Sequence, residues 1–200
     1  REAENGCDVY TTFDANLMDI CETALRKRLE HTRADWGCVI LMDVQTGEIK
    51  AMVNLQRCGD GSYTEGWNMA VADLSEPGST FKVLTTAAAL NEGVVTVDDR
   101  FFDGGDIEGQ GRRIHCWKHG GHGSVSFREV VEGSCNVGFV GVGLRLGAER
   151  FYPYLRSFGM GEVTGISLSG EAKGIMIPET KAVPINLATM AMGQSIAVTP

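Results

Sequence analysis

The stretch E-P-G-S-T-F-K, residues 76–82, constrains this chain more than any other segment. A Pro-Gly pair interrupts the chain, and the residues that follow, up to Asn91, are rich in Ala, Leu and Val. This pattern predicts a buried helix. Ser79 therefore lies at a helix start. Since positions three apart share one helix face, the Lys82 amine can lie beside the Ser79 hydroxyl.

This pairing of Ser79 with Lys82 has a specific chemical use. A serine hydroxyl is a poor nucleophile until a neighbouring base accepts its proton, and a lysine can be that base where burial lowers its pKa. A helix start adds backbone N–H groups that can stabilise an oxyanion. The Ser-x-x-Lys pattern alone is a weak signal, and a capping serine with a solvated lysine is the simpler explanation of it.

A second motif strengthens the catalytic interpretation. The triplet Ser134-Cys135-Asn136 follows later in the chain and is preceded by glycine. It lies between two predicted helices, where a capping serine and a turn asparagine are the simpler explanation. In this order and together, however, the two motifs favour a serine acyl-transfer site made by Ser79, Lys82, Ser134 and Asn136.

The composition excludes several classes of function. A chain of 200 residues, 43% hydrophobic and 22% charged, can bury the core of one domain. The net charge of -8 and the pI near 5.0 argue against a nucleic-acid partner. No apolar run approaches the ~20 residues of a membrane span. Residues 1–6 are polar and are interpreted as the end of a linker, so we expect any targeting segment upstream.

The first part of the chain predicts one helix and one hairpin. Apolar residues at helical spacing between Leu17 and His31 predict an amphipathic helix. The runs 36–43 and 48–53 are strand-like and are joined by a turn that contains glycine. The first of these strands is apolar enough for us to expect burial on both of its faces.

The second part is predicted to be mostly helical around a long loop. Residues 98–124 are rich in glycine, which predicts a long surface loop. Loops of this length usually have a function, and we expect one here. Residues 165–168 look like a strand. Further helices are expected at 127–132, 137–146, 149–158 and 185–192. The fold class is therefore α/β, in the α+β sense.

In this order the motifs resemble the penicillin-binding transpeptidases of bacterial cell-wall synthesis, and specifically the monofunctional class B type. The resemblance covers almost the whole chain from Cys7 onward. Besides the two motifs, the matching segments are His122-Gly123, Phe158-Gly159-Met160-Gly161, Gly170-Glu171, Gly193-Gln194 and Thr199-Pro200. The resemblance implies the penicillin-binding transpeptidase fold, with an α-helical subdomain and an antiparallel sheet that is incomplete in this chain.

The resemblance also implies a reaction and its residues. Ser79 would be the acylated nucleophile, Lys82 its base, and Ser134 and Asn136 the proton relay and the anchor of the substrate amide. The reaction would be peptidoglycan D,D-transpeptidation without a cofactor, at the extracytoplasmic face of the membrane, with an anchor upstream. The implied partners are peptidoglycan stem peptides, β-lactams and proteins of the division or elongation machinery.

One family motif is missing from this sequence. A late Lys-Thr/Ser-Gly does not occur, because Lys173 and Lys181 are followed by Gly174 and Ala182. We therefore expect residues 7–200 to be a partial catalytic domain that does not turn over alone. The 37–54 hairpin would leave an open strand edge, which a second copy or a complementing chain would cover.

Two other functions are compatible with parts of the sequence. A serine β-lactamase shares Ser-x-x-K, but no E-x-x-L-N pattern for the deacylating water occurs between Ser134 and Pro200. A non-catalytic penicillin sensor or scaffold would keep the fold without turnover. Covalent acylation without turnover would separate this class from the enzyme.

The cysteines and histidines raise the question of a metal. His115, Cys116, His119 and His122 lie within eight residues and are zinc-type ligands, but adjacent and two-residue gaps chelate poorly, so we expect no metal. Cys135 is interpreted as a space-filling residue, with a reactive thiol as the alternative. The six cysteines contain no Cys-x-x-Cys pair and are expected to be free and mostly buried: Cys7, Cys21, Cys38, Cys58, Cys116 and Cys135.

Overall fold

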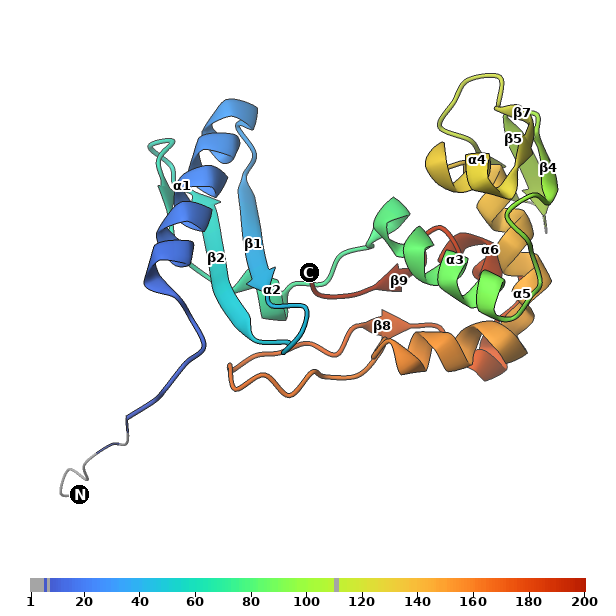
Figure 1. Ribbon diagram of the computed structural model, residues 1–200. Helices are drawn as coiled ribbons and strands as arrows, with labels where there is room; N and C mark the ends of the chain where they lie inside the picture. The colour runs from blue at the N-terminus through green and yellow to red at the C-terminus, as the bar shows by residue number, and fades with distance from the viewer. Residues whose placement is uncertain (1–5, 7, 110–111) are drawn as a thin grey trace. The chain divides into compact units, whose positions relative to one another are not determined.

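The computed structural model describes residues 6, 8–109 and 112–200 (Figure 1). It divides into two compact units, one running to Asp73 and including Pro200, the other comprising Leu74–Thr199. Of the linker expected at residues 1–6, only Gly6 is among the described residues, and the proposed domain start at Cys7 lies outside them. The two units are described separately.

The first unit is a helix packed on a small antiparallel sheet. Helix α1 (Ala15–Thr32) begins where the Asp14 carboxylate accepts hydrogen bonds from the first backbone N–H groups, which confirms the predicted helix. Its buried Leu25 and Leu29 pack with Val53, Leu55 and Tyr63 of the sheet. The other elements are β1 (Trp36–Met42), β2 (Ile49–Arg57), β3 (Tyr63–Thr64) and the short helix α2 (Met69–Ala72).

The predicted hairpin is present, but the expected burial of its first strand is wrong. The strand order is β1-β2-β3, so β2 is central and β1 is an edge strand. Residues 51–55 of β2 are buried, whereas Trp36, Leu41 and Met42 of β1 are exposed. An apolar run does not reveal whether a strand lies at the centre or at the edge of its sheet. Here the central strand β2 is buried, whereas the edge strand β1 is partly exposed.

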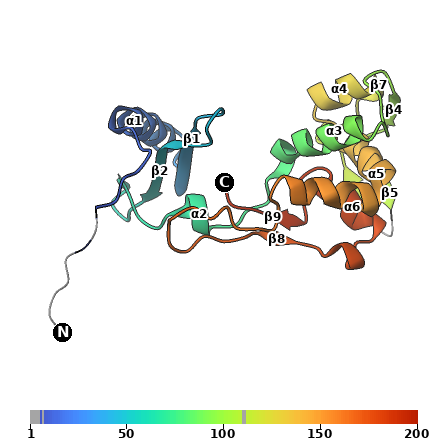
Figure 2. The ribbon, with the colours of Figure 1, turned by 60° about the horizontal axis from the view of Figure 1, so that its bottom comes forward.

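The second unit is built around helix α5 (Asn136–Ser157), which packs against α3 (Lys82–Asn91) and α6 (Pro184–Met190) (Figures 1 and 2). Gly147 has a positive φ and non-helical geometry inside α5, so the two helices expected on either side of it are present across a kink. The remaining helical elements are the 3-10 turns η1 (Gly78–Phe81) and η2 (Glu179–Lys181), and α4 (Phe127–Glu132).

The stretch expected to be a long loop contains four strands. Strand β4 (Arg100–Asp103) pairs with β7 (Gly123–Ser126), and β5 (Asp106–Gly109) pairs with β6 (Arg112–His115). Four-residue strands with glycines around them carry too little periodicity to be recognised from sequence. The strand-like segment 165–168 is not a strand; a short strand β8 (Ile175–Met176) instead pairs with β9 (Ile196–Ala197).

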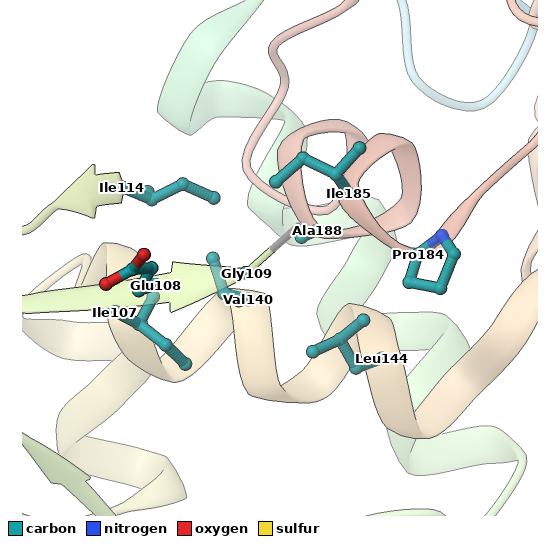
Figure 3. A pocket seen from close by; sticks show the side chains of 9 residues that line it. All are labelled: Ile107, Glu108, Gly109, Ile114, Val140, Leu144, Pro184, Ile185 and Ala188. Atoms are coloured by element: carbon teal, nitrogen blue, oxygen red, sulfur yellow. The ribbon is translucent and has the colours of Figure 1, made fainter. Parts of the chain in front are cut away.

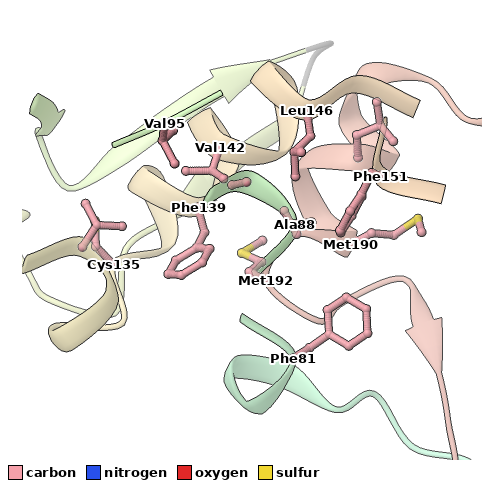
Figure 4. Close-up of a cluster of buried hydrophobic side chains, with 14 of the residues drawn as sticks. Phe81, Ala88, Val95, Cys135, Phe139, Val142, Leu146, Phe151, Met190 and Met192 are labelled. Carbon is pink, nitrogen blue, oxygen red and sulfur yellow. The ribbon is translucent and has the colours of Figure 1, made fainter. Parts of the chain in front are cut away.

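The core of the second unit lies between these helices. Phe139, Val142 and Leu146 of α5 meet Ala88 of α3 and Met190 of α6 (Figure 4). Among the residues described, no helix is both long enough and apolar enough to span a membrane. The core of the second unit fixes the position of α3 relative to α5. The two sequence motifs lie at the starts of these two helices.

Candidate active site

Ser79 lies in a tight turn just before α3. Residues Gly78–Phe81 form the 3-10 turn η1, and α3 begins at Lys82. In a 3-10 helix residues three apart are eclipsed, so this turn aligns Ser79 with Lys82 even more closely than an α-helix would. Ser79 is exposed, whereas Lys82 is buried.

The turn is held in place from the end of the chain. The Gly78 N–H donates to the Gly193 carbonyl at 2.9 Å, and the Ser195 N–H donates to the Glu76 carboxylate at 2.7 Å. A Cβ on Gly193 would collide with the backbone of Gly78. Gly193 thus has a positional role, because close approach of the two backbones requires glycine there.

The Lys82 amine joins the two motifs. Its Nζ donates to the Ser134 carbonyl at 2.9 Å, to the Ser134 Oγ at 3.0 Å and to the Asn136 Oδ1 at 2.7 Å. Ser134 has a φ of 49°, in the left-handed region that non-glycine residues rarely adopt. Backbone strain of this kind is typical of functional sites. It persists only where the surrounding structure holds the residue in that conformation.

Burial shifts the Lys82 amine toward its neutral form. The side chain is 4% exposed, and this burial lowers its pKa below the ordinary value. The amine also lies 5.1 Å from the centre of the Phe139 ring. A lysine amine with a lowered pKa can accept a proton, which an ordinary surface lysine at neutral pH cannot.

A pocket of about 390 Å³ exposes residues of both motifs to solvent. It is lined by Ser79, Lys82 and Ser134 together with Val83, Thr86, Ala87 and Val131. Asn136 faces a neighbouring pocket that also contains His115 and Gln194, and its Nδ2 donates to the His115 carbonyl at 3.1 Å. The four residues singled out from the sequence therefore converge, with Asn136 linked to the others through Lys82.

Cys135, between the two motif residues, belongs to a second cluster. Its Sγ lies 3.2 Å from the Asp103 Oδ2, which is also 2.8 Å from the His122 Nδ1. The Cys116 Sγ is 3.4 Å from that same His122 nitrogen. The ligand atoms of Asp103, Cys116, His122 and Cys135 all lie within 4.8 Å of one another.

This cluster differs from the one considered in the sequence. Cys116 and His122 are part of it, whereas His115 and His119 are exposed and are not. Asp103 was missed, because it precedes Gly-Gly and looked like a turn residue. No spacing rule connects it with Cys135; only the pairing of β4 with β7 and the start of α5 bring them together.

The cluster is electrostatically asymmetric. Burial would raise the pKa of Asp103, but hydrogen bonds from Cys116, His122, the Gly105 N–H and Cys135 hold it well below its usual range. Burial and the neighbouring Asp103 raise the pKa of Cys135 to about 12. At neutral pH, Asp103 is therefore charged and the Cys135 thiol is protonated.

A third pocket lies between β5, β6, α5 and α6 (Figure 3). Its lining is almost wholly apolar, including Ile107, Leu144 and Ile185, with Glu108 as the titratable residue. It contains none of the motif residues. The pocket around Ser79 is therefore the candidate site.

Comparison with known proteins identifies the family to which the chain belongs. The family described as "Penicillin binding protein transpeptidase domain" matches residues 37–200. The chain belongs to this family. The resemblance of the motifs to penicillin-binding transpeptidases is thereby confirmed.

Individual relatives give the same result. Stage V sporulation protein D of Bacillus subtilis is 39% identical over 98% of this chain and 32% of its own length. The probable peptidoglycan D,D-transpeptidase PenA of Neisseria gonorrhoeae is 29% identical over 98% of the chain and 34% of its own length. The chain thus spans about a third of the length of these relatives.

Solved structures confirm the fold class. A peptidoglycan glycosyltransferase from Burkholderia ambifaria superposes with a TM-score of 0.86 at 26% identity, over 95% of this chain and 57% of that one. Penicillin-binding protein 3 of Mycobacterium tuberculosis, complexed with aztreonam, gives 0.83 at 27% identity, over 94% and 43%. The mixed α/β fold expected from the motifs is the penicillin-binding transpeptidase fold.

Proposed function

We propose that this protein is a serine-type peptidoglycan D,D-transpeptidase that is acylated by β-lactams. The observation that carries the proposal is the set of hydrogen bonds from the Lys82 Nζ to Ser134 and Asn136, in the pocket that Ser79 also lines. Membership of the transpeptidase family supports it. The proposed roles are nucleophile for Ser79, base for Lys82, relay for Ser134 and amide anchor for Asn136.

Acylation would begin with the transfer of the Ser79 hydroxyl proton to Lys82. The Ser79 Oγ then attacks the carbonyl carbon between two terminal D-alanines. As the C–N bond breaks, the leaving D-alanine nitrogen takes a proton from Lys82 through the Ser134 hydroxyl. The 3.0 Å contact between the Lys82 Nζ and the Ser134 Oγ makes this relay feasible.

The second half-reaction would reverse these proton transfers. An amine of a neighbouring stem peptide gives up its proton along the same path and attacks the ester carbonyl. The ester C–O bond breaks, and the Ser79 hydroxyl is regenerated. Asn136 uses one lone pair on Oδ1 and one hydrogen on Nδ2 for Lys82 and His115, so the other hydrogen can donate to a substrate carbonyl.

The wider setting is part of the same proposal. Residues 7–200 would contribute to one transpeptidase domain on the extracytoplasmic side of a membrane, with peptidoglycan stem peptides as substrates. Proteins of the division or elongation machinery would be partners, and another chain could pair with the exposed edge of β1. The names of the relatives, which include a sporulation protein and peptidoglycan transpeptidases, support this setting.

The test is the intact mass of the reduced chain after incubation with benzylpenicillin. We expect one adduct per chain on native wild type, none on Ser79→Ala and none after heat denaturation. Ser157→Ala, at an exposed serine of α5, is the matched control and should acquire the adduct at the wild-type rate.

Two outcomes would count against the proposal. An adduct of unchanged stoichiometry on Ser79→Ala would remove Ser79 as the nucleophile. No adduct on folded wild type, with folding verified by circular dichroism and a cooperative thermal transition, would refute acylation by this chain.

A further inference from the structure

We infer that the pocket beside Asn136 binds a carboxylate on the donor stem peptide, and that Arg112 and Arg113 bind this carboxylate. The inference rests on the proposed function, because it names a further part of the substrate of the same site. The pocket has a volume of about 270 Å³, and its lining includes both arginines together with His115, Asn136 and Gln194. It shares no described lining residue with the pocket of Ser79.

Asn136 places this pocket beside a defined part of the donor. The carbonyl that Ser79 would attack belongs to the penultimate D-alanine, so the next amide carbonyl belongs to the residue before it. The remaining hydrogen on the Asn136 Nδ2 would bind that carbonyl, because the other hydrogen is used by the His115 carbonyl. The side chain of the residue before the two D-alanines would then lie next to the pocket.

The pocket is basic although the chain is acidic. The net charge is -8 at pH 7, yet Arg112 and Arg113 line the pocket, and no aspartate or glutamate is among the described residues that line it. A guanidinium group is always charged and binds carboxylates through paired N–H groups. A carboxylate on the donor side chain would be attracted here, whereas an amine would be repelled.

Both arginines are available to a ligand. Arg113 lies 3.8 Å from the Asp106 carboxylate and 3.7 Å from the Glu108 carboxylate, and all three side chains are exposed. Ion pairs of this kind are weak. No described carboxylate forms a salt bridge with Arg112. Its partner in the ladder of β5 and β6 is Gly109, so no side chain stands opposite it.

The free edge of β6 holds these residues beside Asn136. Strands β5 and β6 form a two-stranded sheet, so the second edge of β6 has no strand partner among the described residues. The Cys116 N–H donates to the Gly105 carbonyl at 2.8 Å and so faces β5. Because backbone groups alternate in direction along an antiparallel ladder, those of His115 and Arg113 face the free edge. The bond from Asn136 to the His115 carbonyl agrees with this alternation.

The remaining lining suits the apolar stem of a side chain. Ile114, Ile185 and Met192 also line the pocket, and Ile114 and Ile185 border the apolar pocket of Figure 3 as well. Methylene groups would pack against these residues while a terminal carboxylate reaches the arginines. The pocket therefore selects a donor side chain that ends in a carboxylate over one that ends in an amide or an amine.

The test is the equilibrium binding of three peptides to Ser79→Ala, which cannot form the acyl-enzyme. The probes are acetyl-X-D-Ala-D-Ala with glutamate, glutamine or lysine as X, so only the end of one side chain differs. In NMR titrations at low ionic strength, the glutamate peptide should bind about fivefold more tightly than the glutamine peptide, and the lysine peptide should bind most weakly. Salt at about 1 M should remove most of this difference, because it screens charges beyond about 3 Å.

Variants in the Ser79→Ala background assign the preference to the arginines. Arg112→Gln and Arg113→Gln should each lower the ratio of the glutamate-peptide affinity to the glutamine-peptide affinity, and the double variant should abolish the preference. Arg128→Gln is the matched control, since it removes an exposed arginine of α4 that does not line the pocket, and it should keep the ratio. Equal binding of the three peptides, no binding of any of them, or an unchanged preference in the folded double variant would overturn the inference.

A series of penicillins separates this inference from the proposed function. Carbenicillin and ampicillin carry a carboxylate and an amine, respectively, on the side-chain carbon where benzylpenicillin carries only hydrogen. The ratio of the carbenicillin to the ampicillin acylation rate should be higher on the chain with both arginines than on the double variant that keeps Ser79. If the peptides show the preference but no penicillin acylates the chain, the proposed function fails and the carboxylate site stands. If benzylpenicillin acylates the chain and neither series shows a preference, the carboxylate site fails and the function stands.

Discussion

The two sides of the Ser134-Cys135-Asn136 segment have opposite characters. Ser134 and Asn136 contact the Lys82 amine, which borders a pocket. Cys135 contacts Asp103 in a closed cluster, where the two residues are 0% and 1% exposed. Cys135 is extended, so its neighbours project away from it.

The difference teaches how one short segment can serve two purposes. The Lys82 side holds groups that can exchange protons and reach solvent, as catalysis requires. The Cys135 side is buried and fully hydrogen-bonded, as a fixed support requires. We therefore expect substitutions on the first side to change the rate of acylation, and substitutions on the second to change stability first.

The largest effect is expected for Lys82→Met. Loss of the base should slow acylation by benzylpenicillin by ~10²–10⁴-fold. The free energy of unfolding should change by less than about 1 kcal/mol, because methionine avoids the desolvation of a buried amine, and the acceptors on Ser134 and Asn136 border pockets where water can replace the lost hydrogen bonds. Time-resolved intact mass and urea denaturation measure the two quantities, with exposed Lys173→Met as the control. If Lys82→Met lost stability in proportion to its loss of rate, Lys82 would act by holding the segment in place and not as the base.

An intermediate effect is expected for Asp103→Ala, measured on reduced protein by urea denaturation. Removal of the carboxylate leaves the Gly105 and His122 N–H groups and the Cys135 thiol without their acceptor. At about 1–3 kcal/mol for each unsatisfied group, the free energy of unfolding should fall by about 3 kcal/mol or more.

Asp106→Ala is the matched control for this substitution. Asp106 is exposed and reaches Arg113 at 3.8 Å, so its loss should cost less than about 1 kcal/mol. Equal effects of the two substitutions would mean that the cluster does not support the segment, and the contrast between its two sides would disappear.

The smallest effect is expected in the pH dependence of acylation. Burial lowers the pKa of Lys82, so the neutral amine becomes populated below the ordinary lysine range. The rate should rise with pH through this lowered pKa and then level off. Lys82 should also make the folded state more stable as pH rises from its folded to its unfolded pKa, because the unfolded chain binds more protons there.

The control for the pH profile is Lys82→Arg, which stays protonated and should be slow at every pH. A wild-type rate that is flat with pH, or that falls as pH rises, would show that neutral Lys82 is not the base. In that case the Lys82 side and the Cys135 side of the segment would differ only in their hydrogen bonds and not in proton transfer.

Local signals in the sequence predicted several elements of both units well. The helix from Leu17 is present as α1, and the helix expected at 127–132 is present as α4, which begins with a capping box between Ser126 and Glu129. The turn that joins Ser79 to Lys82 is present as η1 and the start of α3. These predictions succeeded because periodicity, caps and Ser-x-x-Lys spacing act within a few residues of one another.

Predictions that depended on distant partners were less successful. The burial of β1 was overestimated, because only the sheet order made it an edge strand. The strands within 98–124 were missed, because β4 finds its partner β7 about twenty residues later. Short strands gain their stability from such pairing and not from their own residues.

The sequence by itself determined that a serine and a lysine share a turn, that a second motif follows, and that the motifs occur in the order typical of the penicillin-binding transpeptidase family. The tertiary structure decided that Lys82 is buried against Ser134 and Asn136, and that Asp103, Cys116, His122 and Cys135 converge behind them. The physical reason is that packing between separate segments sets the burial of a residue and the convergence of distant side chains. The spacing of residues along one segment does not encode this packing.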